Sequence, residues 1–144
     1  MDFLKALFSK TALKQLVFVL ILFALLIPTA LWDSNSQVKL RYHEDHFRVT
    51  SDRYDMTIYY ADIVSAELTD LKEPGEDIAD ARDDKIIRVG VWKNEAWGEY
   101  IIVADMDCTN CVVLTLHDGR TLVFSHKNDK ATAEAYDTLL THLN

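Results

Sequence analysis

The pattern of apolar and polar residues begins with one long apolar run and then changes to short alternating segments. Residues 16–32, LVFVLILFALLIPTALW, contain no charged side chain. As a helix this run would span about 25 Å, slightly less than a bilayer core of about 30 Å. Starting the helix at Ala12 brings it to bilayer length and leaves Trp32 at an interface, where aromatic residues are common. We therefore predict a transmembrane helix over residues 12–32.

The charges that flank this run predict its orientation. Lys5, Lys10 and Lys14 precede it, whereas acidic residues predominate after it. The positive-inside rule then places residues 1–11 in the cytoplasm, as an amphipathic segment or as the first turns of the helix, and the following domain outside. A cleaved signal peptide is the alternative, but the run is long for one and no A-x-A site follows it. We expect a retained, single-pass anchor in the cell (inner) membrane.

Beyond a polar linker at residues 33–37, apolar and polar residues alternate with the period of two that is typical of half-buried strands. The alternation predicts strands at residues 38–42, 47–51, 56–60, 63–68, 86–92, 99–105, 112–117 and 121–125. Asp118-Gly119 predicts a hairpin turn between the last two. Residues 69–85 contain Pro74-Gly75 and many acids, which predicts an exposed loop with room for a helical turn at residues 78–82.

The chain ends in a predicted helix. Between residues 129 and 143 apolar side chains recur at helical spacing, and Asn128 or Asp129 can cap the first turn. The order is then seven or eight antiparallel strands followed by one helix. A small sheet must hide its edges or close on itself. We predict an all-β domain over residues 38–144, a bent sheet or partly open barrel capped by the C-terminal helix.

Charge narrows the classes of partner. The chain has 15 Lys and Arg against 23 Asp and Glu; three lysines and one aspartate lie in its first 32 residues, which leaves 12 basic and 22 acidic residues beyond them. A domain with a net charge of −10 repels phosphate backbones and anionic headgroups. Nucleic acid is therefore not an expected partner.

Several segments resemble the bacterial PH-like domain family. Residues 57–68, TIYYADIVSAEL, resemble the family's tyrosine-serine-aspartate-isoleucine element and the strand that follows it. Arg88-Val89-Gly90 and Gly98-Glu99-Tyr100 resemble the arginine and glycine run before its central strand, and residues 112–124 resemble its hairpin. The resemblance covers about residues 38–143. It implies a seven-stranded bent barrel capped by a helix, in a small membrane-anchored protein.

Two features depart from that family's pattern. Residues 101–103 lack the glycine expected after the preceding element, and the two cysteines belong to no pattern of the family. Its typical members have no established activity, and a fold alone does not supply one. The resemblance therefore implies a fold but no activity; a protein-interaction or scaffold module is our prediction from the anchor, the absence of catalytic motifs and the aromatic segment described below.

Cys108 and Cys111 form a C-T-N-C motif, the strongest candidate in the sequence for thiol or metal chemistry. Exchange-active pairs with this spacing usually lie at a helix N-terminus, whereas this pair lies between two predicted strands. Outside the cytoplasm, a disulfide across a Thr109-Asn110 hairpin loop is the leading interpretation, and thiol redox exchange and metal binding remain alternatives. Zinc would need two further ligands, and nothing in the sequence brings His117 or His126 to the cysteines. No metal or cofactor is predicted.

Other candidate chemistry is sparse. His43 and His46 fall in a turn between predicted strands, where a solvated turn is the favoured interpretation over a ligand pair. The sequence contains no serine or cysteine nucleophile motif, no H-E-x-x-H and no glycine-rich phosphate loop, and it has only four glycines. We therefore predict no catalysis.

Three aromatic residues form the strongest candidate binding segment. Trp92, Trp97 and Tyr100 bracket residues 93–96, either as an exposed hairpin tip that docks a partner or as rings packed in the core. Our leading hypothesis is a membrane-anchored module that binds another protein through these residues. The alternative is an extracytoplasmic thiol redox or metal-handling module that uses both cysteines. Binding of lipid or cell-wall material inside the barrel is a third, weaker option.

Overall fold

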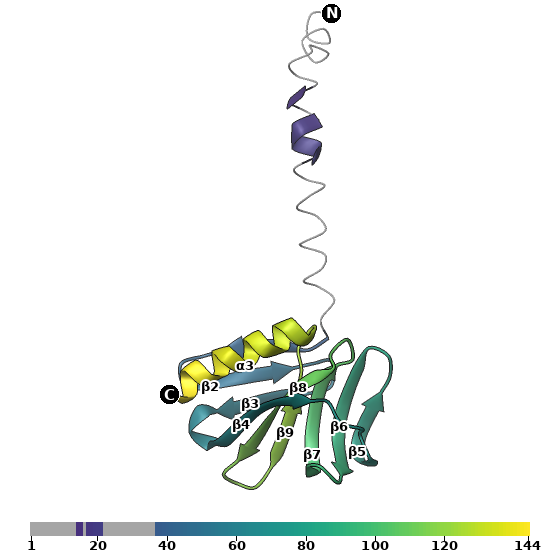
Figure 1. The fold of residues 1–144 in the computed structure, drawn as a ribbon, viewed down its shortest axis with the longest axis vertical. Coiled ribbons are helices and arrows are strands. Elements are labelled where there is room, and N and C mark those ends of the chain that lie inside the picture. The colour runs from purple at the N-terminus through teal and green to yellow at the C-terminus, as the bar shows by residue number, and fades with distance from the viewer. Residues whose placement is uncertain (1–13, 16, 22–36) are drawn as a thin grey trace, which may run out of the picture. The chain divides into compact units, whose positions relative to one another are not determined.

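A computed structural model describes residues 14, 15, 17–21 and 37–144 (Figure 1). The described residues before position 22 are helical and exposed. Most of the predicted anchor, the whole segment 1–11 and nearly all of the linker lie outside the described residues. Within the part that is described, no helix is both long and apolar enough to cross a bilayer. The chain divides into two units, Met1–Asn35 and Ser36–Asn144, and the following concerns the second.

The described part of this unit consists of strands followed by one α-helix, which confirms the predicted all-β class with a C-terminal helix. The elements are β1 (Lys39–Tyr42), β2 (His46–Thr50), β3 (Asp55–Tyr59), the 3-10 turn η2 (Tyr60–Asp62), β4 (Ile63–Asp70), β5 (Glu76–Asp83), β6 (Ile87–Asn94), β7 (Gly98–Asp105), β8 (Asn110–Leu116), β9 (Thr121–Phe124) and α3 (Asp129–Leu143). One sheet has the order β1-β2-β3 and the other β4-β8-β9-β7-β6-β5.

The predicted loop at residues 69–85 is wrong over most of its length. β4 continues to Asp70, and β5 pairs antiparallel with β6 in place of the predicted loop and helical turn. The register shifts twice along β5, and Asp80 has a positive φ of 54°. An edge strand with bulges and solvent-facing acids lacks the regular alternation by which strands are recognised in a sequence. With β5 included, the described residues form nine strands, more than the seven that the resemblance implies.

The prediction of an entirely antiparallel sheet is also wrong at one pairing. β9 lies between β7 and β8 and runs parallel to β7, with Ile101 opposite Leu122 and Val103 opposite Phe124. The β8–β9 hairpin at Asp118-Gly119 is confirmed. That hairpin turns β9 back into the space beside β7. Parallel pairing between strands so far apart in sequence leaves no local signal.

Both faces of the larger sheet are buried at its centre. One face packs against the small sheet and α3, and the core between these elements includes the fully buried side chains of Phe47, Ile87, Leu114, Phe124 and Leu139. The opposite face carries a second cluster, which we call the second core: Trp92, Tyr100, Ile102, Ala104, Cys111, Val113 and Val123. Side chains of a strand alternate between its faces, so adjacent residues of β6 to β9 enter different cores.

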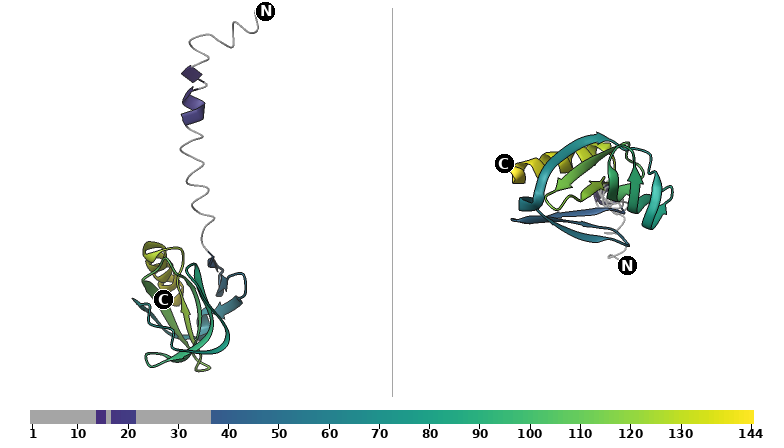
Figure 2. Two further views of the ribbon diagram at one scale, coloured as in Figure 1. Left: turned by 90° about the vertical axis from the view of Figure 1, so that its right-hand side faces the viewer. Right: turned by 90° about the horizontal axis from the view of Figure 1, so that it is seen from below.

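A short connection forces this sheet to curve over the second core. β4 and β5 lie at opposite edges of the sheet, yet only residues 71–75 join them. The six Cα–Cα steps from Asp70 to Glu76 reach about 20 Å, whereas six strands laid flat span about 24 Å. The sheet therefore curls (Figure 2), and the connection crosses its second face, where Leu71 packs against the second core. We call residues 71–75 the crossing segment.

Asp84 anchors the turn between β5 and β6. Its carboxylate accepts hydrogen bonds from the main-chain N–H groups of Ile86 (2.8 Å) and Ile87 (3.0 Å) and from Arg82 Nε (2.7 Å). The backbone donors first, and Arg82 after them, lower the pKa of Asp84 from 3.8 to about 2.

A pKa that is lower in the folded than in the unfolded state predicts stability that is lost in acid. The contribution of Asp84 is present above about pH 4 and disappears as the pH falls towards 2. In urea titrations of full-length protein in detergent between pH 7 and 2, we expect Asp84→Asn to lose less stability on acidification than wild type does. Asp137→Asn, which removes one exposed carboxylate from α3, is the control for net charge. Equal acid slopes in all three proteins would contradict the assignment.

Candidate functional site

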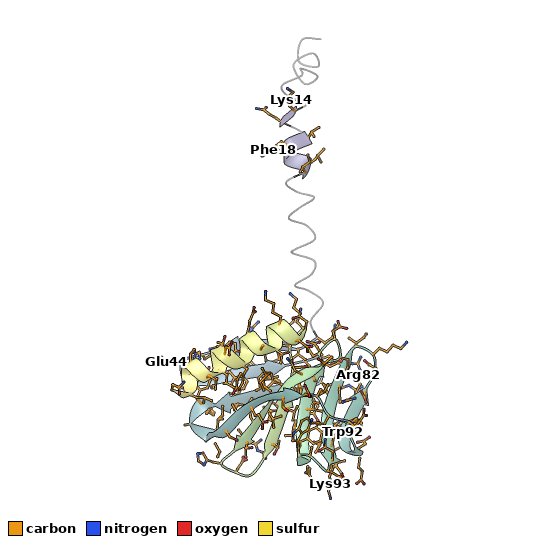
Figure 3. All side chains as sticks on the ribbon, viewed as in Figure 1. Lys14, Phe18, Glu44, Arg82, Trp92 and Lys93 are labelled. Atoms are coloured by element: carbon orange, nitrogen blue, oxygen red, sulfur yellow. The ribbon has the colours of Figure 1, made fainter. Side chains whose placement is uncertain are left out.

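A groove lies between the crossing segment and the turn that joins β6 to β7. Its volume is about 630 Å³. Its lining residues come from both walls: Lys72, Glu73, Gly75, Glu76, Lys93, Asn94, Glu95 and Ala96. We call it the hairpin groove. Figure 3 labels Lys93 at the end of β6, beyond Trp92.

Contacts through main-chain atoms hold the two walls together. Asn94 Nδ2 donates to the Glu73 carbonyl oxygen (3.1 Å), while its Oδ1 accepts from Trp97 N–H (2.8 Å). The Tyr100 hydroxyl donates to the Pro74 carbonyl oxygen (2.8 Å). At Gly75, with φ of 83°, a Cβ would overlap the carbonyl oxygen of Lys93. The groove is therefore preformed, and its width is set by a contact that only glycine allows.

The structure decides between the two interpretations of the aromatic segment residue by residue. Trp92 and Tyr100 are 8% and 1% exposed and belong to the second core. Trp92 Nε1 donates to the carbonyl oxygen of Val89 (3.2 Å). Trp97 is half-buried, with its ring edge-to-face on Tyr100 at 5.1 Å between centroids. The aromatic residues thus support the groove from beneath, and none of them appears among its lining residues.

A buried arginine ties the crossing segment to the sheet. Arg88 is 8% exposed, and its Nε and Nη2 donate to the two carboxylate oxygens of Asp83 (3.1 and 3.2 Å). Its Nη1 donates to the carbonyl oxygen of Lys72 (3.1 Å). The bidentate ion pair and the third hydrogen bond together satisfy the donors of a buried guanidinium. The sequence drew attention to Arg88 only through the family resemblance, and it placed Lys72 in an exposed loop.

The cysteines lie in the connection between β7 and β8 and at the start of β8. Both are buried, and no disulfide joins them in this structure. Because β9 separates β7 from β8, the expected two-residue hairpin loop at Thr109-Asn110 is wrong. Asp129, the first residue of α3, holds this connection instead. Its carboxylate accepts from Thr109 N–H (2.7 Å), Thr109 Oγ1 (2.6 Å) and Asn110 N–H (3.0 Å).

The surroundings of the thiols work against nucleophilic chemistry. Burial raises the pKa of Cys111 to about 12 and raises that of Cys108 as well. Exchange-active thiols have lowered pKa values, because the thiolate is the reacting species. Within the described ranges, no group of three His, Cys, Asp or Glu side chains is arranged to hold a metal ion.

These buried thiols carry a prediction about reactivity. Native full-length protein purified under reducing conditions should react slowly with Ellman's reagent, and both thiols should react at once in guanidinium chloride. The physical reason is the combined loss of access and of thiolate at neutral pH. A fast native reaction would contradict burial. Protein purified without reductant that shows no thiol even when denatured would instead establish the disulfide predicted from the sequence.

His43 and His46 lie where β1 connects to β2, and His117 and His126 follow β8 and β9. His43 and His46 stack at 4.5 Å in the β1–β2 turn, and His46 Nδ1 lies 2.6 Å from Asp45 Oδ1. His43 is exposed, as expected for a solvated turn. His126 Nδ1 lies 2.7 Å from the carbonyl oxygen of Val38, and His117 is exposed.

Comparison with known proteins offers no family assignment. No family model matches the chain, and neither a curated protein nor a solved structure matches it.

Proposed function

We propose that this chain is a single-pass membrane protein whose PH-like domain serves as a non-enzymatic protein-interaction module, with the hairpin groove as its docking site. The observation that carries the proposal is the preformed groove of about 630 Å³, whose two walls are locked by Asn94, Tyr100 and Gly75. A rigid site binds with a smaller entropic cost than one that must be ordered on binding. A preformed surface of this kind suits the recognition of a partner.

The charges of the groove favour a polar protein surface as its partner. Lys72 and Lys93 line it together with Glu73, Glu76 and Glu95. A mixed rim of this kind selects a partner that presents both signs, whereas a polyanion would meet three carboxylates in a domain that is already acidic. The long lysine and glutamate side chains also offer apolar stems for contact.

The membrane anchor and the PH-like relationship rest on the sequence. The anchor is supported by the uncharged run within residues 12–32 and by the lysines before it. The PH-like relationship is supported by the resembling segments, and an all-β body followed by one helix is compatible with it. A reporter fused to the C-terminus, active on only one side of the membrane, tests the proposed extracytoplasmic location. Activity of a reporter that works only in the cytoplasm would overturn that location.

Site-specific photo-crosslinking in the native membrane tests the docking site. With p-benzoylphenylalanine at Ala96, on the groove, we expect a discrete protein adduct. With the same residue at Glu134, on the exposed face of α3, we expect none. Trp97→Ala should weaken the Ala96 adduct, because it removes the ring beneath the turn. Identical adducts from both positions, or none at Ala96, would remove the groove from the proposal.

A further inference from the structure

The small sheet has a free edge at β3. Its order is β1-β2-β3, so β3 has a partner on one side only. The hairpin before it closes with Ser51 N–H donating to the Tyr54 carbonyl oxygen (2.7 Å). Hydrogen-bonded pairs recur at every second residue of an antiparallel ladder, so the main chain of Met56 and Ile58 bonds to β2. The N–H and C=O of Thr57 therefore point away from β2, towards the open edge.

A hollow of about 250 Å³ lies against this edge. The four consecutive β3 residues 55–58 all line it. Alternate side chains of a strand point to opposite faces, so a hollow touched by four in a row lies along the strand's edge. The opposite wall comes from the larger sheet, including Ile101, Leu116 and Leu122, and exposed Arg120 lies at the rim. We call this hollow the edge groove; it shares no lining residue with the hairpin groove.

The floor of the edge groove is apolar and continuous with the main core. Ile58, Leu116 and Leu122 are buried members of that core, and Met56 packs against it. Residues of a strand added beside β3, at the level of Met56 and Ile58, would project their side chains onto this floor. Intervening residues, at the level of exposed Thr57, would face solvent.

These features together select an extended peptide. Free main-chain donors and acceptors are satisfied by another main chain, which an acyl chain does not provide. Residues 37–144 carry 12 basic and 21 acidic side chains, a net charge of −9, which favours a basic ligand and opposes a second copy of the same domain. We propose that β3 binds an extended peptide segment by strand addition, with small apolar side chains on the floor of the edge groove and basic side chains facing solvent.

A synthetic peptide tests which of its residues form main-chain hydrogen bonds with β3. The peptide is Ac-Lys-Val-Lys-Val-Lys-Val-Lys-NH2, titrated into full-length protein in detergent and followed by isothermal titration calorimetry. For the antiparallel addition that the proposal requires, the lysines occupy the solvent-facing phase opposite Thr57, so their main-chain groups pair with β3, whereas the valine main chain points away. N-methylation of two lysine amides should weaken binding by at least about tenfold, while N-methylation of two valine amides should leave it within about twofold. Charge and composition are equal in the two peptides, which excludes a general attraction to the acidic domain.

Variants of Thr57 test the protein side. Thr57→Pro removes the outward N–H without touching the β2 ladder, a position where edge strands tolerate proline. It should abolish peptide binding, whereas Thr57→Val should bind as wild type does. Thermal unfolding of each variant shows whether the fold is retained. If proline unfolds the domain, the two methylated peptides decide alone.

Three results would overturn the proposal. The first is equal binding of the two methylated peptides. The second is a concentration-dependent dimer in sedimentation that Thr57→Pro abolishes, because the edge would then hold a second copy. The third is binding of laurate, but not of the peptide, to the edge groove. None of these results bears on crosslinking at Ala96, so this inference and the proposed function fail separately.

Discussion

Gly90→Ala is expected to lower the free energy of unfolding by about 3 kcal/mol or more and to loosen β5 from β6. Gly90 has φ of 126°, a conformation that side chains rarely adopt. A Cβ there would lie 2.7 Å from Ala81 Cα and 3.0 Å from the carbonyl oxygen of Ala79. Both contacts are with main-chain atoms of the bulged part of β5, so neither can be relieved by turning a side chain. The free-energy cost of the positive φ and the cost of the steric overlap therefore add.

The matched control is Gly119→Ala in the β8–β9 turn. Gly119 also has a positive φ, 87°, but a Cβ there would meet no atom within 4 Å. Only the backbone cost remains, about 1 kcal/mol. Urea unfolding of the two full-length variants separates overlap from strain. Equal losses would show that β5 does not press on Gly90. Because β5 begins at the hairpin groove, Gly90→Ala should also reduce the Ala96 crosslink.

Tyr100→Ala should cost about 3–5 kcal/mol, the range for emptying a large aromatic site in a core. Tyr100 is 1% exposed, packs in the second core and supports Trp97. The curved sheet and the crossing segment enclose it, and a short connection leaves them little freedom to close over a cavity. Denaturant unfolding of the full-length protein measures this loss.

Tyr100→Phe separates the hydroxyl from the ring. It keeps the packing and removes only the hydrogen bond to the Pro74 carbonyl oxygen, so a loss of about 1 kcal/mol is expected. Hydrogen exchange should then rise in the crossing segment while the strands stay protected. If the phenylalanine variant lost as much stability as the alanine variant, the hydroxyl and not the ring would dominate.

Elements with strong local signals could be predicted from the sequence. Eight of the described strands overlap the segments of alternating residues, and the Asp118-Gly119 turn joins β8 to β9. Asn128 caps α3 as expected, with its side chain accepting from Ala131 N–H (2.9 Å). In each case the signal is contained in a few neighbouring residues, so period and cap chemistry suffice.

The candidate site could be predicted only in part. Trp92, Trp97 and Tyr100 marked the hairpin that forms one wall of the groove, but two of the three are buried supports. The opposite wall, residues 72–76, was missed because acids and Pro74-Gly75 are typical of an exposed loop. Only the curl of the sheet turns that segment into a wall, and a curl follows from contacts between distant strands rather than from local composition.

By itself the sequence determined eight strand segments and the C-terminal helix, the acidic character of the domain and the apolar run before it, since each depends on residue type and spacing within a short window. Tertiary structure decided that β9 inserts beside β7, that the acidic segment adds β5, and that both cysteines are enclosed. The physical reason is that strand order and burial depend on which distant surfaces meet. A one-dimensional pattern shows that a face is apolar, but not what covers it.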